Sequence, residues 1–251
     1  MIGAELLDDP HAEPAAVRAQ LADIARLNRL FGGTRAVVDA LEPFFKSAGT
    51  RDALEDSLTV AGGGKRERRW TLVDVGTGCG DIPCAAATCA RRHGIALSLV
   101  GIERIPAAAR LARAAGLTAV LADGGALPLG PGTVDVVIAS QVLHHLPREL
   151  AVRWIASFDR VARRAVVLAD LRRSRLAMAG VWMASLGLGF RRQTRHDAVL
   201  SLRRGYTRRE FNAMLTSAGV PAVAQYRPGC RIVAAWAPID IRRQSLLNTD
   251  V

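Results

Sequence analysis

The stretch from Trp70 to Pro83, WTLVDVGTGCGDIP, decides the fold of this chain. Its first part is apolar and rich in β-branched residues up to Val75, which predicts a buried strand. The strand stops at Gly76-Thr77-Gly78-Cys79-Gly80, and the alanine-rich segment 83–92 favours a helix. Glycines allow positive φ and let a ligand approach the backbone, while the N–H groups that open the helix favour an anionic or electron-rich group. The stretch therefore predicts a strand, a ligand-binding glycine turn and a helix.

Length and composition indicate one large α/β domain with an added helical part, although 251 residues would also allow two small domains. Half of the residues are hydrophobic, so a sizeable core is expected. The formal net charge of +11 would suit nucleic acid or an anionic membrane. However, Lys46 and Lys65 are the only lysines among 34 basic residues. Codon bias in a GC-rich genome explains such an arginine excess at least as well, and nucleic acid is not the expected partner.

Cysteine spacing and hydropathy indicate a cytoplasmic protein. Cys79, Cys84, Cys89 and Cys230 form no CxxC pair, so neither a zinc site nor a disulfide framework is expected. The first 14 residues are mixed and acidic, unlike a signal peptide. The apolar run Leu176 to Phe190 has about 15 residues, whereas a bilayer-spanning helix needs roughly 20. We therefore expect no transmembrane segment. The expected oligomeric state is a monomer or a homodimer.

Residues 1–69 are expected to form an N-terminal helical segment and linker that belong to the substrate cap. Apolar residues recur at helical spacing on both sides of Gly32-Gly33, which predicts two helices within 13–48. A third, weaker helical pattern covers 51–60. The run GGGKRERR at 62–69 then predicts a flexible, charged linker.

From Trp70 onward the pattern alternates between strand and helix, which predicts a parallel sheet with right-handed crossovers. Strands are expected at 71–75, 97–102, 118–122, 134–139 and 164–169, with helices at 83–93, 106–115 and 148–160. A helical lid insertion at 172–206 and a helix at about 207–218 follow. Two last strands, at 222–227 and 231–237, pair as a hairpin. The expected fold is Rossmann-like, with a doubly wound, mostly parallel seven-stranded sheet over 70–240 and a flexible tail at 241–251.

The glycine turn does not fit a dinucleotide-binding fingerprint. In G-x-G-x-x-G counted from Gly76, the third glycine would fall at position 81, which is Asp81. The actual pattern is Asp74-x-Gly76-x-Gly78-x-Gly80. This arrangement at the end of a first strand resembles the class I S-adenosylmethionine-dependent methyltransferases, and the resemblance extends over roughly 70–237.

Three later segments match this family in the same order. Glu103 ends the second strand, where the resemblance implies a carboxylate that accepts hydrogen bonds from the ribose hydroxyls. Ala122-Asp123-Gly124 resembles the segment that meets the adenine, and PGTVDVVIASQVLHHL at 131–146 is most similar to ubiquinone/menaquinone-type members. The implied S-adenosylmethionine site consists of Asp74, Gly76, Thr77, Gly78, Gly80, Glu103, Arg104, Asp123, Gly124, Ser140 and Gln141. As alternatives, Glu103 and Asp123 cap the following turns, and Asp74 acts only through the loop backbone.

Two adjacent histidines are the candidate bases. His144 and His145 follow the fourth strand, and imidazole titrates near neutral pH. Adjacent side chains on a turn point apart, so we expect only one to face the acceptor and favour His144. The alternative is that both are structural or line the cofactor site. Asp170 ends the fifth strand and could act as a base, a metal ligand or a cap, and no metal is assigned.

The apolar segment 176–190 is expected to act as a lid, which implies a small, mostly apolar acceptor. A core helix, a dimer contact or, given its arginine-rich flanks, a peripheral membrane contact are the alternatives. The candidate acceptor-binding residues are aromatic or basic, and they are Phe31, Arg35, Trp182, Phe190 and Tyr206.

The leading hypothesis is a methyltransferase that methylates a phenolic hydroxyl of a secondary metabolite or polyketide. C-methylation of a quinone precursor is the nearest alternative, because the VLHHL loop does not specify the methylated atom. An RNA methyltransferase and a non-catalytic cofactor-binding protein are more distant alternatives.

Overall fold

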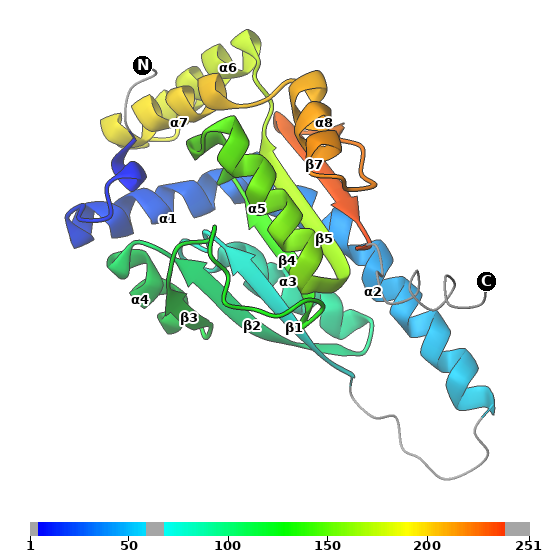
Figure 1. The fold of residues 1–251 in the computed structure, drawn as a ribbon. Coiled ribbons are helices and arrows are strands. Elements are labelled where there is room, and N and C mark those ends of the chain that lie inside the picture. Colours follow the sequence, from blue (N-terminus) through cyan, green and yellow to red (C-terminus); the bar gives the residue numbers. More distant parts are fainter. Residues whose placement is uncertain (1–4, 59–67, 239–251) are drawn as a thin grey trace.

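The structure, a computed structural model, describes residues 5–58 and 68–238. The main part of the expected linker and the whole of the expected tail at 241–251 lie outside these residues. Seven strands form one central sheet, and helices cover both of its faces (Figure 1).

The sheet order is β3-β2-β1-β4-β5-β7-β6. The strands are β1 (Arg68–Val75), β2 (Ile95–Glu103), β3 (Thr118–Leu121), β4 (Val134–Ser140), β5 (Ala162–Leu171), β6 (Gln225–Arg227) and β7 (Arg231–Trp236). The first five are parallel, and β7 runs antiparallel to both β5 and β6. The predicted fold class is confirmed, including the C-terminal hairpin.

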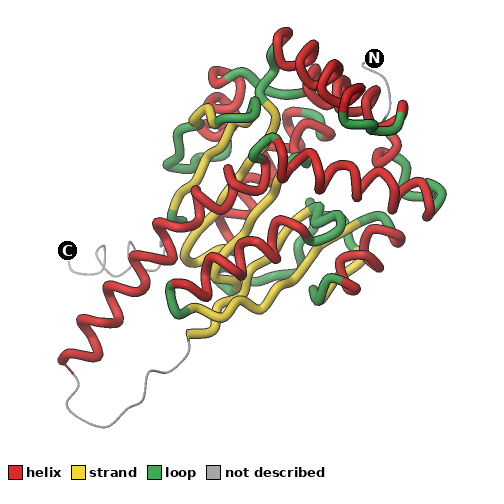
Figure 2. Tube along the Cα trace, turned by 180° about the vertical axis from the view of Figure 1, so that it is seen from behind, coloured by secondary structure: helices red, strands yellow, loops and turns green. Residues whose placement is uncertain are grey.

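Apolar residues on both sides of each central strand explain why the sheet is covered on both faces. α2 (Gly33–Leu58) and α3 (Asp81–Arg92) pack on one face, where Leu41 and Phe45 are fully buried (Figure 2). α5 (Arg148–Val161) and α8 (Arg208–Ser217) pack on the other face, where Phe158 and Phe211 are fully buried. α4 (Pro106–Ala114) joins the α3 side through a cluster of small residues.

The N-terminal part contains α1 (Pro14–Leu30) and α2, separated at Gly32 as predicted. The expected separate helical piece at 51–60 is wrong, because α2 continues through Pro43 to Leu58. Only one glycine, Gly49, precedes that piece. A single glycine is tolerated inside a helix, whereas the pair Gly32-Gly33 separates α1 from α2.

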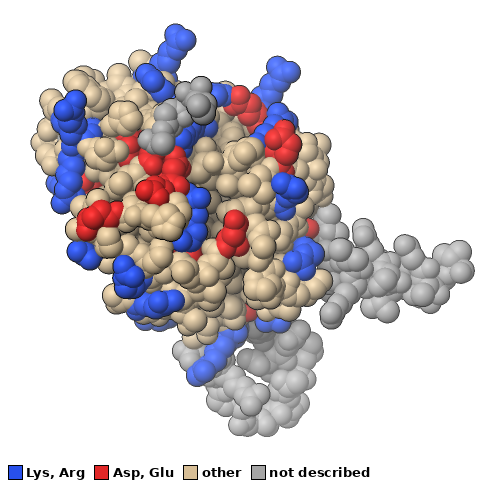
Figure 3. Space-filling view, turned by 60° about the vertical axis from the view of Figure 1, so that its left-hand side comes forward, with Lys and Arg blue, Asp and Glu red and all other residues tan. Residues whose placement is uncertain are grey.

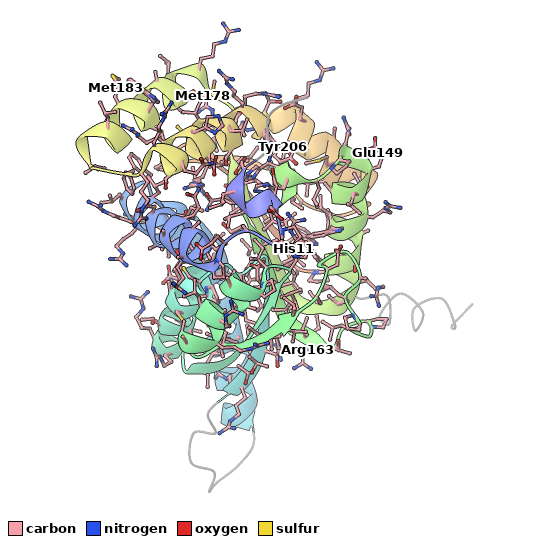
Figure 4. All side chains as sticks on the ribbon, turned by 90° about the vertical axis from the view of Figure 1, so that its left-hand side faces the viewer. His11, Glu149, Arg163, Met178, Met183 and Tyr206 are labelled. Atoms are coloured by element: carbon pink, nitrogen blue, oxygen red, sulfur yellow. The ribbon has the colours of Figure 1, made fainter. Side chains whose placement is uncertain are left out.

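The predicted lid consists of α6 (Arg175–Gly187) and α7 (Arg192–Arg204), which lie beyond the carboxyl end of β5. Figure 4 shows Met178 and Met183 on α6, at the end of the molecule opposite Arg163. Leu176, Trp182 and Met183 are exposed on α6. Among the residues that the structure describes, no helix is long and apolar enough to cross a membrane.

The β6–β7 turn is held against the end of α1 by a close backbone contact. Gly229 has a φ of +73°, and a Cβ atom there would lie 1.6 Å from the carbonyl oxygen of Phe31. Only glycine fits such a position, so this turn and the α1–α2 junction depend on each other.

We expect Gly229→Ala to destabilise the protein more than Gly219→Ala. Gly219 has the same φ of +73° but open space around its Cβ position. The control should lose about 1 kcal/mol of unfolding free energy from backbone strain, and Gly229→Ala at least about 2 kcal/mol more, because a backbone carbonyl must move. Chemical denaturation measures both values. Equal losses would contradict the close contact.

Candidate active site

The candidate site lies where the strand order reverses. β1 has β2 on one side and β4 on the other, and in open α/β sheets ligands bind at the carboxyl ends of strands at such a point. A cavity of about 350 Å³ opens there. It is lined by the loops after β1, β2 and β4 and by α1 and α7, so it joins the predicted donor site to the predicted acceptor side.

The glycine turn after β1 forms one wall of the cavity. Gly76, Thr77 and Gly78 line it, whereas Gly80 is the residue before α3 and lies outside the lining. Gly76 has a φ of +73°, and a Cβ there would lie 2.4 Å from Val142 Cγ2. The absence of a side chain at Gly76 therefore lets the loop after β4 pack against this turn.

Glu103 ties the ends of β1 and β2 together. Its Oε2 accepts a hydrogen bond from the Gly78 amide at 3.0 Å. Its Oε1 accepts hydrogen bonds from the Arg104 and Ile105 amides at 2.8 and 3.0 Å. The carboxylate is buried and lines the cavity together with Arg104, so it both orders the loop and is available to a ligand.

Asp74 adds a second buried carboxyl group to the same wall. Burial, together with the nearby charges of Asp81 and Glu103, raises its pKa to about 8, so this group is largely protonated at neutral pH. Asp74, Asp81 and Glu103 all line the cavity. The Asp81 and Glu103 carboxylates on this wall suit a ligand with cationic groups.

The other predicted cofactor residues also line the cavity. Asp123 and Gly124 follow β3, and the Asp123 Oδ1 accepts a hydrogen bond from the Gly125 amide at 2.7 Å. Ser140 ends β4, and Gln141 follows it. The Gln141 amide donates to Asn28 Oδ1 at 2.7 Å and so connects this loop to α1.

His144 forms a buried pair with Asp170 at the carboxyl ends of β4 and β5. Its Nδ1 lies 2.7 Å from Asp170 Oδ1, and its backbone amide donates to Asp170 Oδ2 at 3.2 Å. Burial tends to raise the pKa of Asp170, but His144 outweighs it, so the pKa is lowered and the carboxylate is charged. His144 lines the cavity, and its buried Nε2 contacts no hydrogen-bonding partner within the described chain.

This geometry is that of an oriented base. A carboxylate on Nδ1 holds the ring in one tautomer and stabilises a proton taken up at Nε2. Asp170 is thus placed to orient the His144 ring. Its position at the end of the fifth strand had left its role open between a base, a metal ligand and a cap.

The expectation that only one of the two adjacent histidines faces the site is wrong, because His145 also lines the cavity. Its ring stacks on that of His144 with centroids 4.1 Å apart, and its Nδ1 lies 2.7 Å from Asp8 Oδ1. Arg204 of α7 donates to Glu5 Oε1 and Asp8 Oδ2 at 3.3 and 3.0 Å. The segment from Glu5 to Asp8, which contains the short helix η1 (Leu6–Asp8), is called the N-terminal cap below.

The N-terminal cap covers the cavity through charged contacts. The Arg104 guanidinium donates to the carbonyls of Leu7 and Asp8. Burial raises the pKa of Glu5, whereas hydrogen bonds from His145 and Arg204 outweigh burial at Asp8 and lower its pKa. Glu5, His144 and His145 place potential metal-ligand atoms within 4.8 Å of one another. The Glu5 carboxylate already accepts from Ser201 and Arg204, and no metal is assigned.

The predicted acceptor-binding residues lie in different surroundings. Phe31 lines the cavity. Phe190 is buried under Arg26, and Tyr206 packs on Phe211, both outside the lining. The side chain of Arg35 is 83% exposed and pairs with Asp39, and Trp182 lines a separate hollow on the lid.

Sequence reasoning missed the polar groups that α1, the N-terminal cap and β7 contribute. Gln20 and Asn28 lie at buried positions of α1, and both line the cavity. Both lie on the apolar face of a predicted helix, and polar residues at such positions were a signal that α1 contributes to a binding site. Arg231 and Asp197 line the same cavity, and nothing in their local sequence distinguishes them.

Comparison with known proteins agrees with this geometry. Residues 73–169 match the family model described as "Methyltransferase domain". An "Uncharacterized methyltransferase" of Mycobacterium avium (strain 104) is 33% identical over 135 residues, covering 52% of this chain and 51% of that protein. The chain thus matches about half the length of this curated relative.

Two solved structures share the fold. A possible histamine N-methyltransferase from Thermotoga maritima is 14% identical with a TM-score of 0.50, covering 88% of this chain and 99% of that one. The CurJ carbon methyltransferase is 12% identical with a TM-score of 0.50, covering 75% and 52%. At this level of identity, the likeness concerns the fold alone.

The raised pKa of Asp74 predicts a pH-dependent stability. Its ordinary pKa of 3.8 applies to the unfolded chain, while the folded pKa is about 8. Folding therefore favours the protonated form, and stability from this group falls as pH rises from about 4 to 8. Asp74→Asn has no ionising group at this position and lacks this loss. Its unfolding free energy minus that of the wild type should therefore increase by up to about 1.4 kcal/mol per pH unit in that window.

Urea unfolding at pH 5, 6, 7 and 8 measures this difference. Asp123→Asn, at an exposed carboxyl group, is the matched control and should differ from the wild type by a constant amount. A constant difference for Asp74→Asn as well would contradict the raised pKa.

Proposed function

We propose that the protein is an S-adenosylmethionine-dependent methyltransferase that methylates a phenolic hydroxyl of a small, mostly apolar acceptor. The observation that carries this proposal is the continuity of the cavity. It connects the glycine turn and Glu103, at the ends of β1 and β2, with the unpartnered Nε2 of His144 beyond β4. The methyltransferase domain match over 73–169 and the likeness to the methyltransferase of Mycobacterium avium support methyl transfer, without specifying the acceptor.

The residues present fit S-adenosylmethionine. The turn at Gly76 and Gly78 lines the cavity, and the Glu103 carboxylate beside it can accept hydrogen bonds from ribose hydroxyls. S-adenosylmethionine supplies an activated methyl group bound to a sulfonium sulfur. Asp123 and Gly124 are proposed to contact the adenine, as the family resemblance implies.

His144 is proposed to remove the acceptor proton. A phenol is a poor nucleophile until its O–H proton is lost, and the proton passes to Nε2 while the electron pair stays on oxygen. Asp170 then stabilises the imidazolium through its 2.7 Å contact with Nδ1. The N-terminal cap and the lid, residues 172–206, are proposed to exclude water from the cavity. Water then does not compete with the acceptor for the methyl group.

One face of the molecule gives no support to RNA as the acceptor. On the face shown in Figure 3, basic and acidic side chains are interspersed over the described residues, and the arginines do not form one continuous basic patch there.

Glu103→Gln should weaken binding of S-adenosylhomocysteine at least about tenfold, because a charged acceptor for the ribose hydroxyls is lost. Isothermal titration calorimetry measures the dissociation constant. Glu149→Gln is the control, since Glu149 is exposed on α5, away from the cavity (Figure 4). Unchanged affinity in folded Glu103→Gln would contradict the assignment of Glu103 to the donor site.

His144→Gln should lower the rate of methyl transfer to phenols by about 10²- to 10⁴-fold, the usual contribution of a general base, while S-adenosylhomocysteine still binds. A panel of phenols assayed by mass spectrometry and NMR measures the rate and shows whether oxygen or carbon carries the new methyl group. His93→Gln, which removes a histidine bound to Glu42 outside the cavity, is the control. Methylation of ring carbon alone would favour the C-methyltransferase. Cofactor binding without any turnover would favour a non-catalytic protein.

A further inference from the structure

Arg231 is a buried arginine that neither the predicted donor site nor the predicted base requires. It is the first residue of β7, pairs with Leu171 of β5, and is 5% exposed. Its side chain lines the same cavity as His144 and the glycine turn.

Most of its hydrogen-bonding capacity is unused. Nη2 donates to Asn28 Oδ1 at 3.3 Å. The Nε and Nη1 atoms are buried and lack an acceptor among the residues at 5–58 and 68–238. Gly33 leaves space for this arrangement, because a Cβ there would lie 2.9 Å from Nη2 and 2.6 Å from Asn28 Oδ1. Native proteins rarely leave buried donors unpaired without a functional reason.

The guanidinium carries a charge that is only partly balanced. Burial lowers the pKa of Arg231 to about 10, and the nearby Asp170 opposes this shift, so the group stays cationic at neutral pH. The Asp170 oxygens, however, are hydrogen-bonded to His144 and to the Leu171 amide. Asn28, the residue that does contact the guanidinium, is neutral. A buried cation in this position is best balanced by an anion that enters the cavity.

The place of Arg231 in the sheet puts its backbone on the acceptor side. Glu103 ends β2 and the glycine turn follows β1, whereas β7 lies beyond β4 and β5. At about 4.8 Å per strand, β7 is about 14 Å from β1. The side chain reaches back to Asn28, which also bonds Gln141 and Asp81, so the guanidinium lies between the acceptor side and the donor residues.

We propose that Arg231 binds a carboxylate carried by the methyl acceptor, so that the substrate is an aromatic hydroxy acid rather than a neutral phenol. The inference rests on the proposed function. A carboxylate accepts hydrogen bonds from more than one guanidinium nitrogen, which fixes the direction of a flat ring as well as its charge. The apolar groups of the lid and of α1 surround the remainder of the acceptor, and the hydroxyl faces His144.

The test compares matched pairs of probes on protein saturated with S-adenosylhomocysteine. In each pair, such as 4-hydroxybenzoate with 4-hydroxybenzamide and 3,5-dihydroxybenzoate with 3,5-dihydroxybenzamide, only the charge differs. The wild type should bind at least one acid at least about tenfold more tightly than its amide, as expected for charge-assisted hydrogen bonds. In Arg231→Met the ratio should fall to about one, and Arg231→Lys should keep part of it. Wild-type protein that prefers none of the acids would overturn the inference.

Two further measurements separate this inference from the alternatives. Arg231→Met should keep a thermal midpoint at least equal to that of the wild type, because an incompletely paired buried charge is removed. Its affinity for S-adenosylhomocysteine should stay within about twofold of the wild type. If affinity falls for that ligand but not for its decarboxylated analogue, 5′-deoxy-5′-(3-aminopropylthio)adenosine, the guanidinium serves the donor and the inference is overturned.

Arg163→Met is the control for the loss of an arginine, since Arg163 pairs with Asp135 at the opposite end of the sheet (Figure 4). It should keep the acid preference of the wild type. Absence of S-adenosylhomocysteine binding in the wild-type protein would instead contradict the proposed function, so the two failures are distinguishable.

Discussion

The hydrogen bonds of Glu103 are the interaction on which the site depends. One carboxylate oxygen accepts from the Gly78 amide, and the other accepts from the two amides that follow β2. The glycine turn has positive φ at Gly76, Gly78 and Gly80, a conformation that an unrestrained loop would hold only at a cost in entropy. By tying this turn to the end of β2, Glu103 keeps the cavity wall in place before any ligand arrives.

A second constraint is the closure of the cavity by parts of the chain that are distant in sequence. The N-terminal cap reaches α7 through Arg204 and reaches the loop after β4 through His145. Asp197 of α7 accepts hydrogen bonds from the Leu6 amide of the cap and from the Gln20 side chain of α1. These contacts are charge-assisted and largely buried, the Arg204 and Glu5 side chains being 14% and 7% exposed, so they hold the cap against the rest of the cavity wall.

The sequence allowed the sheet and the donor side to be predicted because both depend on local signals. The apolar run before Asp74 and the glycines after it specify a strand and a turn, and Glu103 follows a run with the same pattern. α2 was divided wrongly, because its last part has a weaker apolar pattern, although the helix continues to Leu58. The N-terminal cap and Arg231 could not be predicted, since their roles come from contacts between residues nearly 200 positions apart. Charged residues at such positions look like surface residues until the fold is known.

The strand order explains how these distant groups become one site. In the chain, the site residues appear as Asp74, Glu103, His144, Asp170 and Arg231, but across the sheet the order is Glu103, Asp74, His144, Asp170 and Arg231. The edge thus begins with the Glu103 carboxylate at the donor end, passes through a histidine oriented by an ionised aspartate, and ends at a buried guanidinium. The groups at its two ends, Glu103 and Arg231, have opposite charge. A cationic donor and an anionic acceptor would each bind at the end that attracts it, with their reacting groups meeting beside His144, and the same polarity would disfavour either ligand in the reversed position.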